Sequence, residues 1–160
     1  MSREHRLTRT ILALFLLTIA VPGWTAVDHG EHQANQKNEA GVSLNNGKPW
    51  PTDAPLRKGM EVIQREMRDA LPRIHAGTYT AKNYTTLAKK MRAHLNHITR
   101  NCKLKPEADL QLHRILMEIL HGSEVLEAKQ GQSSGAAIIV RALDLYGRHF
   151  DHPGWKPLPH

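Results

Sequence analysis

Four stretches of this chain repeat apolar residues at alternating steps of three and four positions, which lines one face of an α-helix. Short connections carrying proline, glycine or capping residues separate the stretches, and no segment alternates with the period of a β-strand. The sequence therefore predicts an all-α fold, an antiparallel up-down-up-down four-helix bundle. The apolar stripes are Leu56, Met60, Ile63, Met67, Leu71 and Ile74; then Tyr84, Leu87, Met91, His94 or Leu95, Ile98 and Cys102; then Leu112, Leu116, Ile119 and Leu120; then Ile139, Ala142, Leu143, Tyr146 and His149 or Phe150.

Helix boundaries follow from residues that favour helix ends. Thr52 or Asp53 can cap the first helix and Gly77 ends it. The second helix runs from the cap Thr80 to Cys102, and the third begins at Pro106, a residue suited to the first helical position, and extends to about 129. The fourth helix is expected over 136–150. The bundle is thus predicted over residues 52–156.

The first 51 residues differ in character from the bundle. Residues 1–23 resemble an export signal, with Arg3, Arg6 and Arg9 before an apolar run at 11–21 that is short for a membrane span; an uncleaved anchor is the alternative. Cleavage is expected after position 20 or 23, or as late as 26. Polar residues dominate 27–51, which predicts a disordered linker docked at Trp50 and Pro51. The expected location is a bacterial periplasm.

The net charge of +7 does not indicate nucleic-acid binding. Loss of the signal leaves about +5, and the bases alternate with acids as on a solvated helix surface. Because Cys102 is the only cysteine, the chain forms no internal disulfide.

Metal-ligand residue types gather where the second helix meets the third. In an up-down-up-down bundle, the start of helix one, the end of helix two, the start of helix three and the end of helix four share one end. The candidate ligands on this basis are Met60, His94, His97, Cys102, His113 and His149, with Asp109 orienting His113 from outside the ligand set. Thioether, thiol and imidazole donors together suit copper or haem iron, and cysteine with histidine suits zinc. The competing interpretation is that Met60 and Cys102 fill the core.

A second metal site depends on the signal cleavage. If cleavage follows Ala26, the mature chain begins Val27-Asp28-His29, and the amino group, two amide nitrogens and His29 offer square-planar ligation for Cu(II) or Ni(II). A solvated histidine-containing linker is the alternative.

Other chemistry lacks its motifs. The chain has no Cys-x-x-Cys-His, so covalent c-type haem is excluded. A second Glu-x-x-His beside Glu118 and His121 is missing, which argues against a di-iron centre. Ser133 and Ser134 form a loop and not a nucleophile elbow, and we expect no enzyme activity.

Two blocks of the chain, NCKLKPEADLQLH and YGRHFDHPGW, resemble a group of small, largely uncharacterised exported proteobacterial four-helix-bundle proteins, some of which occur near heavy-metal or copper resistance functions. The resemblance covers about residues 52–156. The architecture is also similar to periplasmic haem-b and c-prime bundle cytochromes. In the haem-b type, a Met early in helix one and a His late in helix four hold the iron, and Met60 and His149 occupy comparable positions.

These observations lead to one principal expectation and two alternatives. The principal one is an exported periplasmic protein that binds copper for buffering in metal tolerance. The alternatives are a non-covalent haem-b electron carrier and a metal-free periplasmic interaction module in which the HPGW residues plug one end of the bundle. A periplasmic protein partner and a homodimer are compatible with all three.

Overall fold

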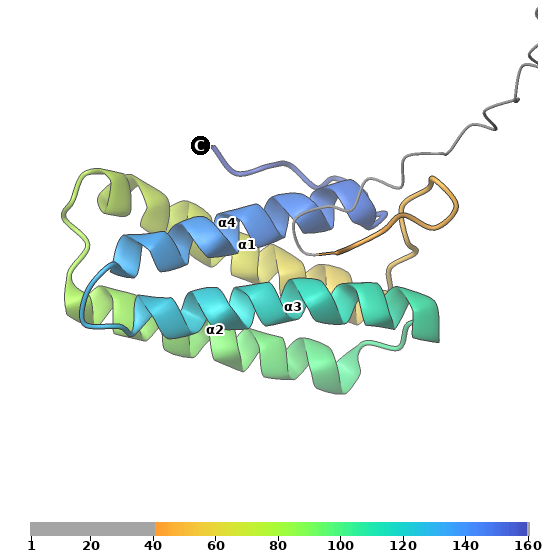
Figure 1. The fold of residues 1–160 in the computed structure, drawn as a ribbon, viewed down its shortest axis with the longest axis horizontal. Coiled ribbons are helices and arrows are strands. Elements are labelled where there is room, and N and C mark those ends of the chain that lie inside the picture. Colours follow the sequence, from red (N-terminus) through yellow and green to blue (C-terminus); the bar gives the residue numbers. More distant parts are fainter. Residues whose placement is uncertain (1–40, 160) are drawn as a thin grey trace, which may run out of the picture. The chain divides into compact units, whose positions relative to one another are not determined.

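The computed structural model describes residues 41–159, which form four helices in chain order (Figure 1). These are α1 (Ala54–His75), α2 (Ala81–Asn101), α3 (Pro106–Leu126) and α4 (Gln132–His149). Each helix packs antiparallel against the next, and α4 also contacts α1. The predicted all-α four-helix bundle is confirmed.

The helix ends follow the expected capping chemistry in most places. Asp53 caps α1, Thr80 and Asn83 form a capping box on α2, and Pro106 is the first residue of α3. The fourth helix differs, because it begins at Gln132 and not at 136. Gly131 has a φ of +72°, which glycine adopts without strain, and this turn starts α4 immediately after it.

The core is built from the predicted stripes, with large side chains such as Met60, Ile98, Leu112 and Tyr146 fully buried. Glycine allows α3 and α4 to approach closely. A Cβ atom on Gly135 would lie 2.6 Å from the carbonyl oxygen of Gly122, so any larger residue there would force the two helices apart. The backbones of α3 and α4 therefore approach each other closely at Gly122 and Gly135.

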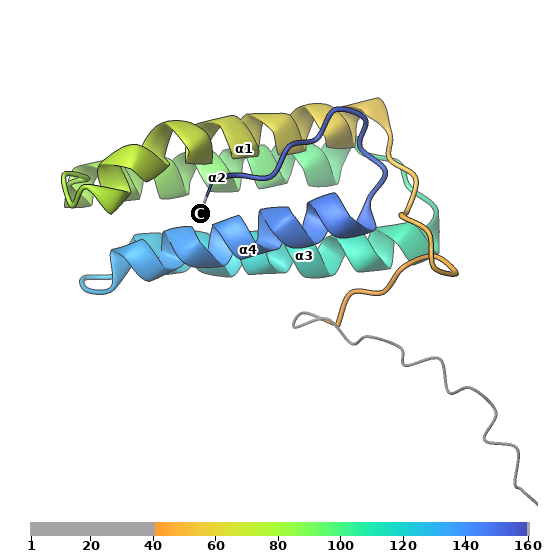
Figure 2. The ribbon, with the colours of Figure 1, turned by 90° about the horizontal axis from the view of Figure 1, so that it is seen from above.

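The seam between α1 and α4 is partly filled by the C-terminal segment, residues 150–159. Figure 2 shows this segment running between the two helices. Trp155 packs on Gly147, Leu158 is 3% exposed, and the Gln64 side-chain Nε2 donates a 2.7 Å hydrogen bond to the Lys156 carbonyl. Hereafter we call residues 155–159 the C-terminal strap.

Residues 41–51 pack against the bundle, which differs from the expected disordered linker. Val42 is 1% exposed and joins the core. Trp50 docks as expected: its backbone N–H donates to the His149 carbonyl at 2.7 Å, and its carbonyl accepts from Asp151 N–H at 2.8 Å. This packing depends on contacts more than 60 residues away, such as Ser43 N–H to the Gln111 side chain, which local composition does not report. The expected signal peptide, the rest of the linker and His29 lie outside the described residues.

Among residues 41–159, no helix combines the length and apolar character needed to cross a membrane.

Candidate functional site

The two expected ligands of the bundle interior, Met60 and His149, are both buried. Met60 is fully enclosed in the core. His149 Nδ1 lies 2.8 Å from the Leu145 carbonyl oxygen, and because a carbonyl only accepts, this nitrogen carries the proton. His149 thus already makes a hydrogen bond within α4.

The two histidines of α2 lie on other faces. His94 is half-buried, and its Nε2 is enclosed without a hydrogen-bond partner among the residues that the structure describes. Burial lowers the pKa of His94, although the Glu66 carboxylate opposes the shift. His97 is exposed, and its Nδ1 lies 3.3 Å from the Asn101 side-chain nitrogen.

Cys102 is half-buried at the C-cap of α2, whereas His113 and Asp109 are exposed on α3. Burial raises the pKa of the Cys102 thiol, and the carboxylates of Asp53 and Asp109 raise it further, so the thiol stays protonated near neutral pH. Within residues 41–159, no three histidine, cysteine, aspartate or glutamate side chains group so as to hold a metal ion. The structure therefore does not bring the six predicted ligands together into one such cluster.

Asp53 joins the start of α1 to the connection between α2 and α3. Its Oδ1 accepts from Leu56 N–H at 2.8 Å and caps α1, while its Oδ2 accepts from Lys103 N–H at 2.5 Å. The residues that follow Cys102 thus help to hold the bundle end together.

The block YGRHFDHPGW, residues 146–155, anchors the C-terminal segment through buried His152. Its Nδ1 lies 2.9 Å from the Tyr146 hydroxyl on α4, and its Nε2 lies 3.1 Å from the Glu61 carboxylate on α1. Burial raises the pKa of Tyr146 strongly, so the hydroxyl remains protonated and can donate to Nδ1, while Nε2–H donates to Glu61. Trp155 packs against these hydrogen-bonded residues, with its ring centroid 4.8 Å from that of Tyr146. His152 therefore links α1, α4 and the segment after α4.

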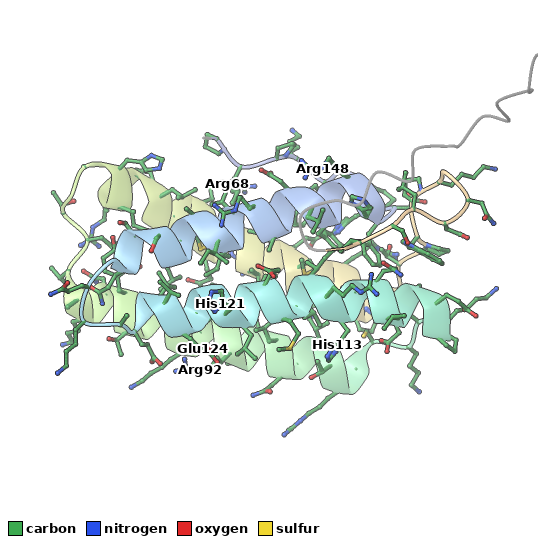
Figure 3. All side chains as sticks on the ribbon, viewed as in Figure 1. Arg68, Arg92, His113, His121, Glu124 and Arg148 are labelled. Carbon is green, nitrogen blue, oxygen red and sulfur yellow. The ribbon has the colours of Figure 1, made fainter. Side chains whose placement is uncertain are left out.

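Soft donors do share one surface, on the outside of α3. His113, Met117 and His121 are all exposed and follow one another at steps of four, so adjacent members are neighbours on the helix surface. Figure 3 labels His113 toward the start of α3 and His121 toward its end. The His121 Nδ1 lies 4.0 Å from the Glu124 carboxylate. We call His113, Met117 and His121 the α3 donor stripe.

The ligand set predicted from the sequence contains His113 but not Met117 or His121. The signal that identifies them is their spacing. Positions 113, 117 and 121 fall outside the apolar stripe of the third helix, so an amphipathic helix turns them outward together.

Two surface hollows among the described residues are lined in part by α4. The first, of about 520 Å³, lies beside Trp155 and Phe150 and is bordered by Asp144, Arg148 and Asp151. The second, of about 350 Å³, lies between the end of α1 and the start of α4, where Pro159 reaches it. Residues of α4 and of the C-terminal strap contribute to the lining of both hollows.

The fold defines this chain as a four-helix all-α domain. Comparison with protein-family models, with curated proteins and with solved structures found no match.

Proposed function

We propose that this protein is an exported copper-binding protein that buffers copper through the α3 donor stripe. The observation that supports the proposal is the exposure of two imidazoles and a thioether at steps of four along one helix. Thioether and imidazole are donors that copper accepts. This ligand set differs from the predicted one, in which Met60 and His149 are buried and Cys102 is half-buried.

The spacing determines how many donors one ion can use. His113 and His121 are eight residues apart, about 12 Å along the helix, so one ion cannot bridge them. Met117 lies four residues from each, and we infer that it pairs with either histidine. Met117 is therefore the shared ligand, and each histidine is partly replaceable by the other.

Solvent exposure favours a buffering role over permanent storage. A two-donor site on an open surface releases its ion readily, and a partner can displace it without unfolding the bundle. The Glu124 carboxylate lies 4.0 Å from the His121 Nδ1, so the end of the stripe also offers an imidazole and a carboxylate to divalent copper.

The test is a Cu(I) titration of the full chain in competition with a colorimetric chelator. Met117→Leu keeps an apolar side chain of similar volume and should weaken binding about tenfold. His113→Gln and His121→Gln should each weaken it less, and the double variant should match Met117→Leu. His75→Gln, an exposed histidine on α1, serves as the matched control and should leave affinity unchanged.

Two further variants distinguish competing sites. If Cys102→Ala weakens Cu(I) binding and Met117→Leu does not, the ligand set predicted around Cys102 replaces the α3 donor stripe. If only His29→Ala weakens Cu(II) binding, the site lies at the amino terminus of the mature chain. Either result would reject the proposal.

The haem-b alternative receives less support from the geometry. Met60 is fully enclosed by core side chains, and His149 Nδ1 is engaged with Leu145. Neither residue lines the two hollows described above. The positions of Met60 and His149 therefore do not favour haem binding.

The interaction module is the second candidate function, favoured by the two hollows beside the C-terminal strap. In that interpretation the HPGW residues close the bundle end, as the contacts of His152 and Trp155 do here.

A further inference from the structure

The seam between α1 and α4 accommodates an extended polypeptide along part of its length. The C-terminal strap lies in it, with Leu158 buried to 3% exposure. Gln64 on α1 holds this extended chain by donating to the Lys156 carbonyl at 2.7 Å. The seam therefore already provides an apolar side-chain position and a backbone hydrogen bond for a peptide.

The seam continues beyond the strap as an open hollow of about 350 Å³. Its apolar lining comes from Leu71 and Ile74 on α1 and from Ala136 and Val140 on α4, while Pro159 reaches its edge. A volume of this size is at the low end of ligand pockets and suits one or two apolar side chains. The hollow thus extends the apolar surface that Leu158 uses.

The titratable side chains that line this hollow are both basic, His75 at the end of α1 and Arg141 on α4. Arg73, also in the last turn of α1, donates to the Asn83 side chain and is directed to α2. The hollow also lies by the N-terminus of α4, where the helix dipole is positive. An acidic group is therefore the complementary partner for the rim.

We propose that the hollow between Leu71, Ile74, Ala136 and Val140 binds an extended segment of a partner polypeptide that inserts an apolar side chain and places an adjacent acidic residue on Arg141. The C-terminal strap supplies the precedent, because it is an extended segment with a buried leucine in the same seam. Charge complementarity with Arg141 and His75 distinguishes the partner segment from the strap, which carries Lys156. This binding site is separate from the α3 donor stripe and holds whether or not copper binds.

The experiment is a fluorescence anisotropy titration of the full chain, in the presence of a copper chelator, with a labelled synthetic peptide of sequence Pro-Leu-Pro-Leu-Glu-Glu. A second peptide has lysine in place of both glutamates. We expect saturable binding of the acidic peptide and at least fivefold weaker binding of the basic one. Arg141→Glu should reverse that preference, and Ala137→Leu, which adds bulk at an exposed position lining the hollow, should weaken both peptides.

Arg148→Glu is the matched control. It lies seven residues after Arg141 on α4, about 10 Å along the helix, and borders the other hollow. This variant should leave the affinity for the acidic peptide unchanged. Equal loss in Arg141→Glu and Arg148→Glu would show attraction by net charge alone and would overturn the proposal.

Two other results would also overturn it. If neither peptide shows saturable binding to protein whose helix content and melting temperature are unaltered, the proposed peptide-binding site is rejected. Displacement by dodecanoate at lower concentration than the unlabelled acidic peptide would assign the hollow to an anionic amphiphile and not to a polypeptide.

Discussion

Asp53 offers a sharp test of how the bundle end is held together. One carboxylate oxygen caps α1 at Leu56 N–H, and the other accepts from Lys103 N–H in the connection after α2. Loss of an N-cap costs about 1 kcal/mol, and loss of a hydrogen bond to a charged acceptor about 1.5–3 kcal/mol. Because Asp53 is half-exposed, we take the lower part of that range and expect Asp53→Ala to cost about 2–3 kcal/mol.

A second substitution separates the two contributions. Serine at position 53 retains the N-cap but has a single oxygen, so it loses the bond to Lys103. Asp53→Ser should therefore cost about 1–2 kcal/mol, intermediate between wild type and Asp53→Ala. The free energy of unfolding from urea titration, monitored by circular dichroism at 222 nm, measures both.

Asp69→Ala provides the control, because Asp69 is an exposed acid on the same helix and should change stability by less than about 0.5 kcal/mol. The reasoning is refuted if Asp53→Ala destabilises no more than Asp69→Ala. If Asp53→Ser is as stable as wild type, the bond to Lys103 contributes nothing and only the cap matters.

Two further predictions concern His94 and Gly147. Burial lowers the pKa of His94, so the folded state binds the proton more weakly than the unfolded state, and stability present above about pH 6.5 is lost as pH falls through the folded pKa. His94→Leu should remove this acid-side loss and also remove the enclosed Nε2 atom that lacks a hydrogen-bond partner among the described residues. Urea unfolding between pH 7.5 and 5 measures the effect, and equal pH dependence in both proteins would contradict it. For Gly147→Ala, the new Cβ would lie 2.5 Å from Trp155 Nε1, so we expect net destabilisation and faster chymotrypsin cleavage at Trp155. Helix propensity alone would instead stabilise the variant by about 1 kcal/mol, so the sign of the measured change decides.

The helices were predictable because their determinants are local. The spacing of Leu56, Met60 and Ile63, the cap at Thr80 and the proline at 106 each act within a few residues, and the structure has a helix at each place. The early start of α4 was missed because the positive φ of Gly131 begins a helix among polar residues that otherwise read as a loop.

The predicted ligand set shows the limit of topology. Chain order indicates which helix ends share one end of the bundle, but it does not state which way each side chain points around its helix. Met60 points inward and His113 outward, so a shared height does not bring them together. The apolar period of α3 would have placed His113, Met117 and His121 outside its buried stripe, but the predicted ligand set did not use that information.

The sequence by itself therefore determined four amphipathic helices and their antiparallel order, since both depend on apolar period, local capping and short connections. Only the tertiary structure decided that Val42 and Leu158 pack onto the bundle, that Asp53 reaches Lys103, and that His152 joins Glu61 to Tyr146. Apart from the bond between His152 and Tyr146, these contacts join residues far apart in the chain. Their free energy comes from burial and hydrogen bonds that exist only once the helices have assembled.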